Sequence, residues 1–443
     1  MQPPSFTQNP DAWYEAYETL DNSDQQAAFL LDTLRQPLTQ EDFDQSDLGS
    51  VLVDFVGDRF EREKRFEDTL DFLRQFEQLQ PKLYAGEFHY YADNFLDYYC
   101  FSGQAEKAEP VIRFFKENPN AGIDSFLPIQ RAVWYWLKQE WGIQLAAETY
   151  QPVREHKGYW GNPEIEMALA IHTSSLQTVY EQWLSSGTFD PDAAKTVAAD
   201  YHFTLSEALW ECYRAALSTP LDTTTAASRF AREKRVNFMA ELNLRFLVWM
   251  HHRGFPFYSA QLIWDSLANY WDTTHPKSTA AHTYFGLDKQ SFDRYVAGKK
   301  NLMFPQVEEI GATLWGAAFM YDFLGEHKFI DAVARENVQK AIATLKQDFF
   351  NGLGSSAWKA AFVVKAWPKA DSVSPIDFEV EGVQFQDSFI KPDPRVEQQA
   401  LSFDNFFDAV LPDPGSKPRS MYEKVFGHNP PTRSKKKRKK KKR

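Results

Sequence analysis

The chain has 443 residues, and its 61 acidic and 49 basic side chains give a formal net charge of -12. Hydrophobic residues make up 43 % of the chain and include 13 Trp, 19 Tyr and 37 Phe, which is enough for a core and excludes a generally disordered protein. Two cysteines exclude a disulfide scaffold and a cysteine-rich zinc site, so we expect a reducing compartment.

The first residues lack the basic and apolar segments of a secretory signal. The longest uncharged apolar stretch runs from 310 to 321, whereas a membrane-spanning helix needs about 20 such residues. We therefore expect a cytoplasmic protein without a membrane span.

Apolar residues recur at helical spacing in one segment after another. These segments are 66–79, 88–99, 108–115, 129–137, 176–183, 205–216, 239–250, 307–324 and 338–349. Strand-like alternation is nearly absent before about residue 350. The pattern predicts an all-α body over 1–350, built as a solenoid-like array of helical hairpins.

The composition of the chain changes after residue 350, since nine of the 24 prolines fall between 368 and 431. We take 351–426 as a separate proline-rich segment. Within it, Ile376, Phe378 and Val380 alternate with polar residues, and a turn at 381–382 would place them opposite Val383 and Phe385. This alternation predicts a short β-hairpin at 376–386 that packs on the last helices.

One stretch of the body resembles a tetratricopeptide repeat. The matching residues are Ala92, Phe95, Leu96 and Tyr99 in a first helix, Gly103 in the turn, Ala108, Ile112 and Phe115 in a second helix, and Pro119 after it. The match covers one repeat unit, and no clear second copy follows at the family's period of about 34 residues. The resemblance implies a helical-hairpin solenoid with a peptide-binding or scaffolding role.

A second stretch resembles the helix-turn-helix of phage-repressor-like regulators. The matching residues are Gly286 and Leu287 at the turn, 288–295 in the recognition helix, 298–301 in the next turn, and Val307, Ile310 and Leu314 in the following helix. The resemblance implies that Lys289, Gln290 and Arg294 face DNA, with Lys299 and Lys300 near phosphates. Val296 and Leu302 replace the customary Glu and Pro around the second turn. The alternative is that 286–301 caps and connects two further solenoid helices.

The last residues carry a dense run of positive charge. Its basic residues are Arg433, Lys435, Lys436, Lys437, Arg438, Lys439, Lys440, Lys441, Lys442 and Arg443. Without these ten, 39 basic side chains remain against 61 acidic ones, so the rest of the chain carries -22. Like charges at this density repel, which predicts a disordered tail over 427–443.

A tail of this kind neutralises phosphates without reading bases. Nucleic acid or the ribosome is therefore the first expected partner, and an anionic membrane is the second. The alternative is intramolecular, with the positive tail lying on the acidic body or serving solubility.

No reactive constellation emerges from the sequence. The metalloprotease, P-loop, Gly-x-Ser-x-Gly and dinucleotide-binding patterns are absent. His251 and His252 are adjacent and would point apart on a helix, and His275 and His282 lack a nearby cysteine or carboxylate pair. We expect no catalytic, cofactor-binding or metal-binding residue.

Three hypotheses follow, in this order. The first is a non-enzymatic scaffold whose helical body binds a protein or peptide and whose tail contacts nucleic acid or the ribosome. The second is a DNA-binding regulator that uses 286–301, and the third is an enzyme of unrecognised type. The sequence leaves the oligomeric state open.

Overall fold

A computed structural model describes residues 4–45, 47–102, 163–200, 206–222, 235–275, 277–299, 307–353 and 367–391, with 104, 107, 111, 230, 357 and 358. Every regular element in this part of the chain is a helix, which confirms the all-α prediction. The elements are α1 Pro10–Glu18, α2 Ser23–Leu34, α3 Gln40–Gln45, α4 Leu48–Gly57, the π-helical turn η1 Asp58–Arg62, α5 Phe66–Leu79, α6 Pro81–Phe101, α10 Pro163–Ser186, α11 Pro191–Asp200, α12 Glu207–Ser218, α14 Arg235–His251, α15 Phe257–Thr274, α16 Ala281–Tyr284, α17 Lys289–Lys299, α18 Val307–Glu326, α19 Ala332–Leu353 and α21 Pro375–Ile390.

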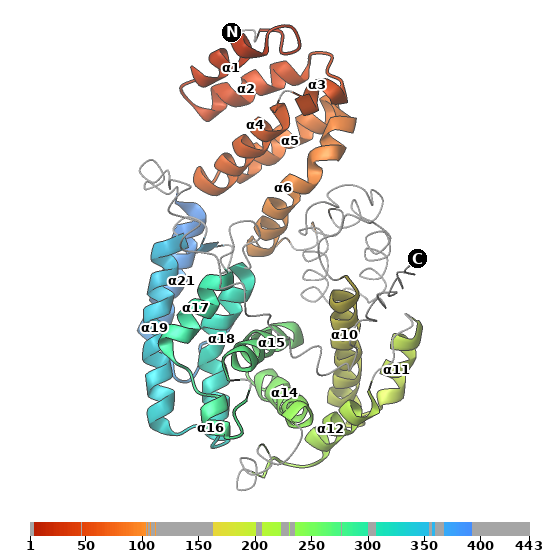
Figure 1. Ribbon diagram of the computed structural model, residues 1–443, viewed down its shortest axis with the longest axis vertical. Helices are drawn as coiled ribbons and strands as arrows, with labels where there is room; N and C mark the ends of the chain where they lie inside the picture. Colours follow the sequence, from red (N-terminus) through yellow and green to blue (C-terminus); the bar gives the residue numbers. More distant parts are fainter. Residues whose placement is uncertain are drawn as a thin grey trace, which may run out of the picture.

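Helices α1 to α5 lie together at one end of the molecule, and α6 runs from them toward the remaining helices (Figure 1). The Asn22 side chain caps α2 by accepting from the backbone N–H groups of Asp24 and Gln25. Trp13 of α1 is fully buried, and its Nε1 donates to Thr33 Oγ1 of α2 at 2.8 Å. This hydrogen bond satisfies a buried indole where the two helices pack.

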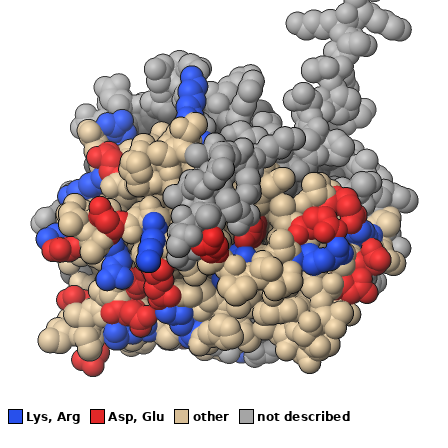
Figure 2. All heavy atoms as spheres, turned by 90° about the horizontal axis from the view of Figure 1, so that it is seen from below, with Lys and Arg blue, Asp and Glu red and all other residues tan. Residues whose placement is uncertain are grey.

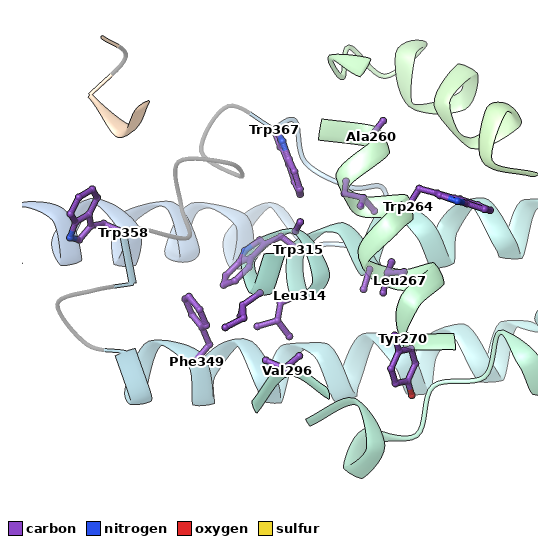
Figure 3. Close-up of a cluster of buried hydrophobic side chains, with 14 of the residues drawn as sticks. Ala260, Trp264, Leu267, Tyr270, Val296, Leu314, Trp315, Phe349, Trp358 and Trp367 are labelled. Carbon is purple, nitrogen blue, oxygen red and sulfur yellow. The ribbon is translucent and has the colours of Figure 1, made fainter. Parts of the chain in front are cut away.

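Helix α18 is the centre of the C-terminal part. It packs against α14, α15, α17 and α19, and almost all of its residues are buried. Figure 3 shows how Leu314 and Trp315 of α18 meet Phe349 of α19 and the α15 side chains around Leu267. A helix that is apolar all round is stable only when neighbours enclose it, so this arrangement explains the uninterrupted apolar stretch in the sequence.

Helices that follow one another in sequence pack as neighbours in several places. The pairs are α5 with α6, α10 with α11, α14 with α15, and α18 with α19. These contacts agree with a helical-repeat arrangement. The first half of the tetratricopeptide-like unit lies in α6, whereas almost all of its second half lies outside the described residues.

The predicted β-hairpin at 376–386 is wrong, because this segment is one continuous helix, α21. Pro375 occupies the first turn, and Ser374 caps the helix by accepting from the Asp377 backbone N–H at 3.0 Å. Phe385 is buried against Trp315 and Phe350. A cap, an N-terminal proline and tertiary packing of the aromatic face therefore override the strand preference of the β-branched residues.

Candidate nucleic-acid interface

The two expected nucleic-acid-binding segments differ in what the structure describes. The tail residues 427–443 and Lys300 lie outside the described part. Lys289, Gln290, Arg294 and Lys299 all lie on α17.

The segment before α17 is held by buried polar contacts. Tyr321 of α18 donates its hydroxyl to the Phe285 carbonyl at 2.9 Å, and Trp271 of α15 donates to the same hydroxyl at 3.2 Å. Tyr284 of α16 donates to Asp272 at 2.9 Å. These bonds tie the turn to α15 and α18, so the position of α17 is set by the core.

A close approach also explains the glycine at the turn. A β-carbon at Gly286 would lie 3.2 Å from the Thr283 carbonyl oxygen, a tight contact that glycine avoids. The turn at Gly286 is followed by α17, and the helix before it, α16, is a single turn, Ala281–Tyr284.

Helix α17 is anchored by one face. Phe292 and Val296 are buried, and the Phe292 ring packs against Tyr270 of α15 with centroids 4.9 Å apart. Tyr295 donates to the Ser266 carbonyl of α15 at 2.9 Å. At the start of the helix, Asp288 accepts from the Ser291 backbone N–H at 2.8 Å.

The opposite face of α17 is exposed and carries two of the expected DNA-facing residues. Gln290 and Arg294 lie there one turn apart, and Lys289 is exposed as the first residue of the helix. Asp293 is exposed on the same helix, so the two cations have only one unit of positive charge in surplus. This face presents hydrogen-bond donors to a ligand without forming a strongly basic patch.

Lys299 is not exposed for contact with a ligand as Gln290 and Arg294 are. Its ammonium group forms an ion pair with Glu309 of α18 and lies over the Tyr295 ring, 5.4 Å from the centroid. Burial acts to lower the pKa of Lys299, but the Glu309 carboxylate outweighs burial and leaves the pKa raised. The structure thus places Lys299 within the junction of α17 and α18, apart from the exposed face.

The surface of the body shows no concentration of basic groups on the side displayed in Figure 2, where acidic and basic side chains are interspersed among the described residues. No helix in the described ranges is long and apolar enough to cross a membrane. Within those same ranges, no group of three or more His, Cys, Asp or Glu side chains is arranged to hold a metal ion.

A polar chain between α14 and α15 was missed by reasoning from the sequence. Asn243 donates to Gln261 Oε1 at 3.2 Å, and Gln261 donates to Asp265 Oδ1 at 2.9 Å. Burial raises the pKa of Asp265 to about 7. The spacing of Gln261 and Asp265 by four residues was the one available signal, since helical neighbours at that spacing bond to each other.

Comparisons with protein-family models, with curated proteins and with solved structures find no match to this chain. The tetratricopeptide-like and helix-turn-helix resemblances therefore stay predictions. The fold itself defines the class, which is an all-α protein with an enclosed central helix.

Proposed function

We propose that this chain is a non-enzymatic interaction protein whose helical body binds a protein or peptide partner and whose basic tail contacts nucleic acid or the ribosome. The observation that carries the proposal is the separation of charge along the chain. Residues 433–443 hold ten basic groups and no acid, whereas the rest of the chain carries -22. An acidic body repels phosphates, so contact with a polyanion falls to the tail.

The test compares the full chain with a variant in which the ten basic residues of 433–443 are replaced by serine or glycine, which keeps the length. Binding to random-sequence duplex DNA and to RNA is followed by fluorescence anisotropy across a salt series. For the full chain on duplex DNA, the logarithm of the binding constant should fall with that of salt by about 0.9 per neutralised phosphate. Unchanged binding by the neutral variant would rule out the tail as the nucleic-acid-binding segment.

The exposed face of α17 supports a second candidate function, sequence-specific DNA binding. Lys289, Gln290 and Arg294 are side chains suited to base edges and phosphates, and they stand outward from a helix fixed by its other face. Selection from a random duplex library should then enrich a preferred sequence, and Arg294→Ala should relax it at one position at a cost of about 1–3 kcal/mol.

The matched control for that selection is Lys82→Ala, which removes an exposed cation from α6. It should leave the preferred sequence unchanged. A selection in which the full chain enriches no sequence would exclude the second candidate and leave the first untouched.

A further inference from the structure

Helix α21 is apolar on two opposite faces. The inner face packs on the body: the Phe385 ring lies 4.9 Å from Trp315 and 4.8 Å from Phe350, centroid to centroid. Phe389 stacks on Phe66 of α5 at 4.8 Å. The inner face therefore attaches α21 to α18, α19 and α5.

The outer face is exposed to solvent. Ile376 is 72 % exposed, and Val380, Val383 and Ile390 are 51 %, 60 % and 56 % exposed. Among the described residues, these make up four of the seven large apolar side chains that are exposed, so the exposed apolar surface is concentrated here. Single exposed apolar residues are ordinary, whereas several on one side of a helix mark an interaction site, here interrupted between Val383 and Ile390 by Asp387. We call these four residues the outer stripe.

The spacing of the outer stripe is that of a helix-pairing seam. Its residues are separated by four, three and seven positions, which keeps them on one side of a helix. Helix α21 has 16 residues and is about 24 Å long, enough for an equally long helix to lie along it. β-Branched residues have weaker helix propensity than leucine, so helix formation alone does not account for them.

Charged groups beside the outer stripe select among possible occupants. Asp377 and Glu379 are exposed on the same helix, and Asp387 pairs with Lys391 at 2.7 Å. A second copy of α21 lying parallel to the first would bring these acids against each other, and the chain's own segment 401–411 has two aspartates and no basic residue. The carboxylates of Asp377 and Glu379 also repel an anionic membrane. A helix with basic flanks is attracted.

We propose that the outer stripe binds an amphipathic helix of a partner protein, and that lysine or arginine side chains flank the apolar face of that helix. The inference rests on the proposed protein-binding role of the body and gives it a place and a partner chemistry. The acids at Asp377 and Glu379 orient the partner, and the apolar contacts along Ile376 to Ile390 supply the affinity.

The test titrates the full chain with two labelled synthetic amphipathic peptides, one with leucine on one face and lysine on its flanks, the other with glutamate in place of lysine. The lysine peptide should bind more tightly. The double variant Val380→Asp and Val383→Asp should weaken its binding by about tenfold or more. Two added negative charges would strengthen a merely electrostatic attraction, so a weakening reports the apolar contact.

The matched control is Val333→Asp, at a singly exposed valine of α19, and it should leave binding unchanged. If the double variant fails to fold, the same titration with Ile376→Asp, in the first turn of α21, decides the question. The proposal is overturned if the glutamate peptide binds as tightly, or if the variants bind as the parent does. It is also overturned if the double variant converts a dimer to a monomer, or if deletion of 401–411 strengthens peptide binding. None of these outcomes tests the proposed contact of the tail with nucleic acid or the ribosome.

Discussion

Lys346 of α19 and Glu381 of α21 form a buried ion pair in which the ammonium group donates to both carboxylate oxygens, at 3.0 and 3.2 Å. The two side chains are only 7 % and 17 % exposed. Trp315 of α18 donates to the same carboxylate at 2.8 Å. The pair therefore fixes how α21 sits on the body, and with it the direction in which the outer stripe points.

Removing one partner of this pair should be strongly destabilising. Glu381→Gln leaves the ammonium group of Lys346 buried without its counter-charge, and burial already lowers the pKa of this lysine. We expect a loss of about 3–5 kcal/mol in the free energy of unfolding, measured by urea denaturation. Glu379→Gln, on an exposed position of the same helix, should change it by less than about 0.5 kcal/mol. Equal effects of the two changes would show that the ion pair makes no particular contribution to the free energy of unfolding.

A substitution at Gly382, inside α21, distinguishes the observed helix from the hairpin that the sequence predicted. A β-carbon at Gly382 meets no atom within 4 Å, so Gly382→Ala should raise the free energy of unfolding by about 0.5–1 kcal/mol. The contrasting change is Gly187→Ala, because Gly187 has φ of +72° and alanine is strained there. Chemical denaturation should show opposite signs, and a loss of stability at Gly382 would contradict the helix.

The packing of α18 on α15 should be sensitive to a single carbon. A β-carbon at Gly316 would lie 2.5 Å from the Ile263 side chain, which is itself fully buried. We expect Gly316→Ala to cost about 1–3 kcal/mol in the free energy of unfolding. Gly298→Ala on α17, where a β-carbon has open space, is the control and should not destabilise. A tolerant Gly316 would mean that the two helices are not in close contact.

The stability of the fold should depend on pH through Asp265. Burial, opposed by the Gln261 hydrogen bond and helped by the charge of Glu309, raises the pKa of Asp265 from 3.8 to about 7. The folded state therefore holds a proton that the unfolded state releases, so this group's contribution to stability is fully present below pH 3.8. It is lost as the pH rises to about 7 and stays constant above that value.

Asp265→Asn removes this titration, because an amide does not ionise in the range. The variant should lose less stability than the parent chain between about pH 4 and 7, as followed by thermal or urea unfolding at each pH. Asp293→Asn, at an exposed position of α17, is the control and should keep the parent profile. Parallel profiles for the parent and Asp265→Asn would contradict the assignment.

Helical periodicity allowed much of the body to be predicted. The apolar stripe of 66–79 coincides with α5, and Pro81 is the first residue of α6. These predictions succeed because one buried face at a spacing of 3.6 residues is a local signal. The resemblance to a helix-turn-helix placed Lys289, Gln290 and Arg294 together on one helix, and the structure adds that these side chains are exposed.

What failed depended on contacts between distant residues. Ile376, Phe378 and Val380 alternate with polar residues as a strand would. The Ser374 cap, Pro375 and the packing of Phe385 and Glu381 against Trp315 and Lys346 favour a helix instead. Lys299, which the helix-turn-helix resemblance places near phosphates, pairs with Glu309 of the next helix, and this pairing cannot be read from the sequence.

By itself, then, the sequence determined the all-α class, the positions of helices such as α5, α12 and α18, and the separation of an acidic body from a basic tail, because periodicity and charge are properties of neighbouring residues. Only the tertiary structure decided which faces are buried, which cations are paired and that α21 presents Ile376, Val380, Val383 and Ile390 outward. These depend on which helices meet, and burial or pairing in a core outweighs the local preference of a short segment.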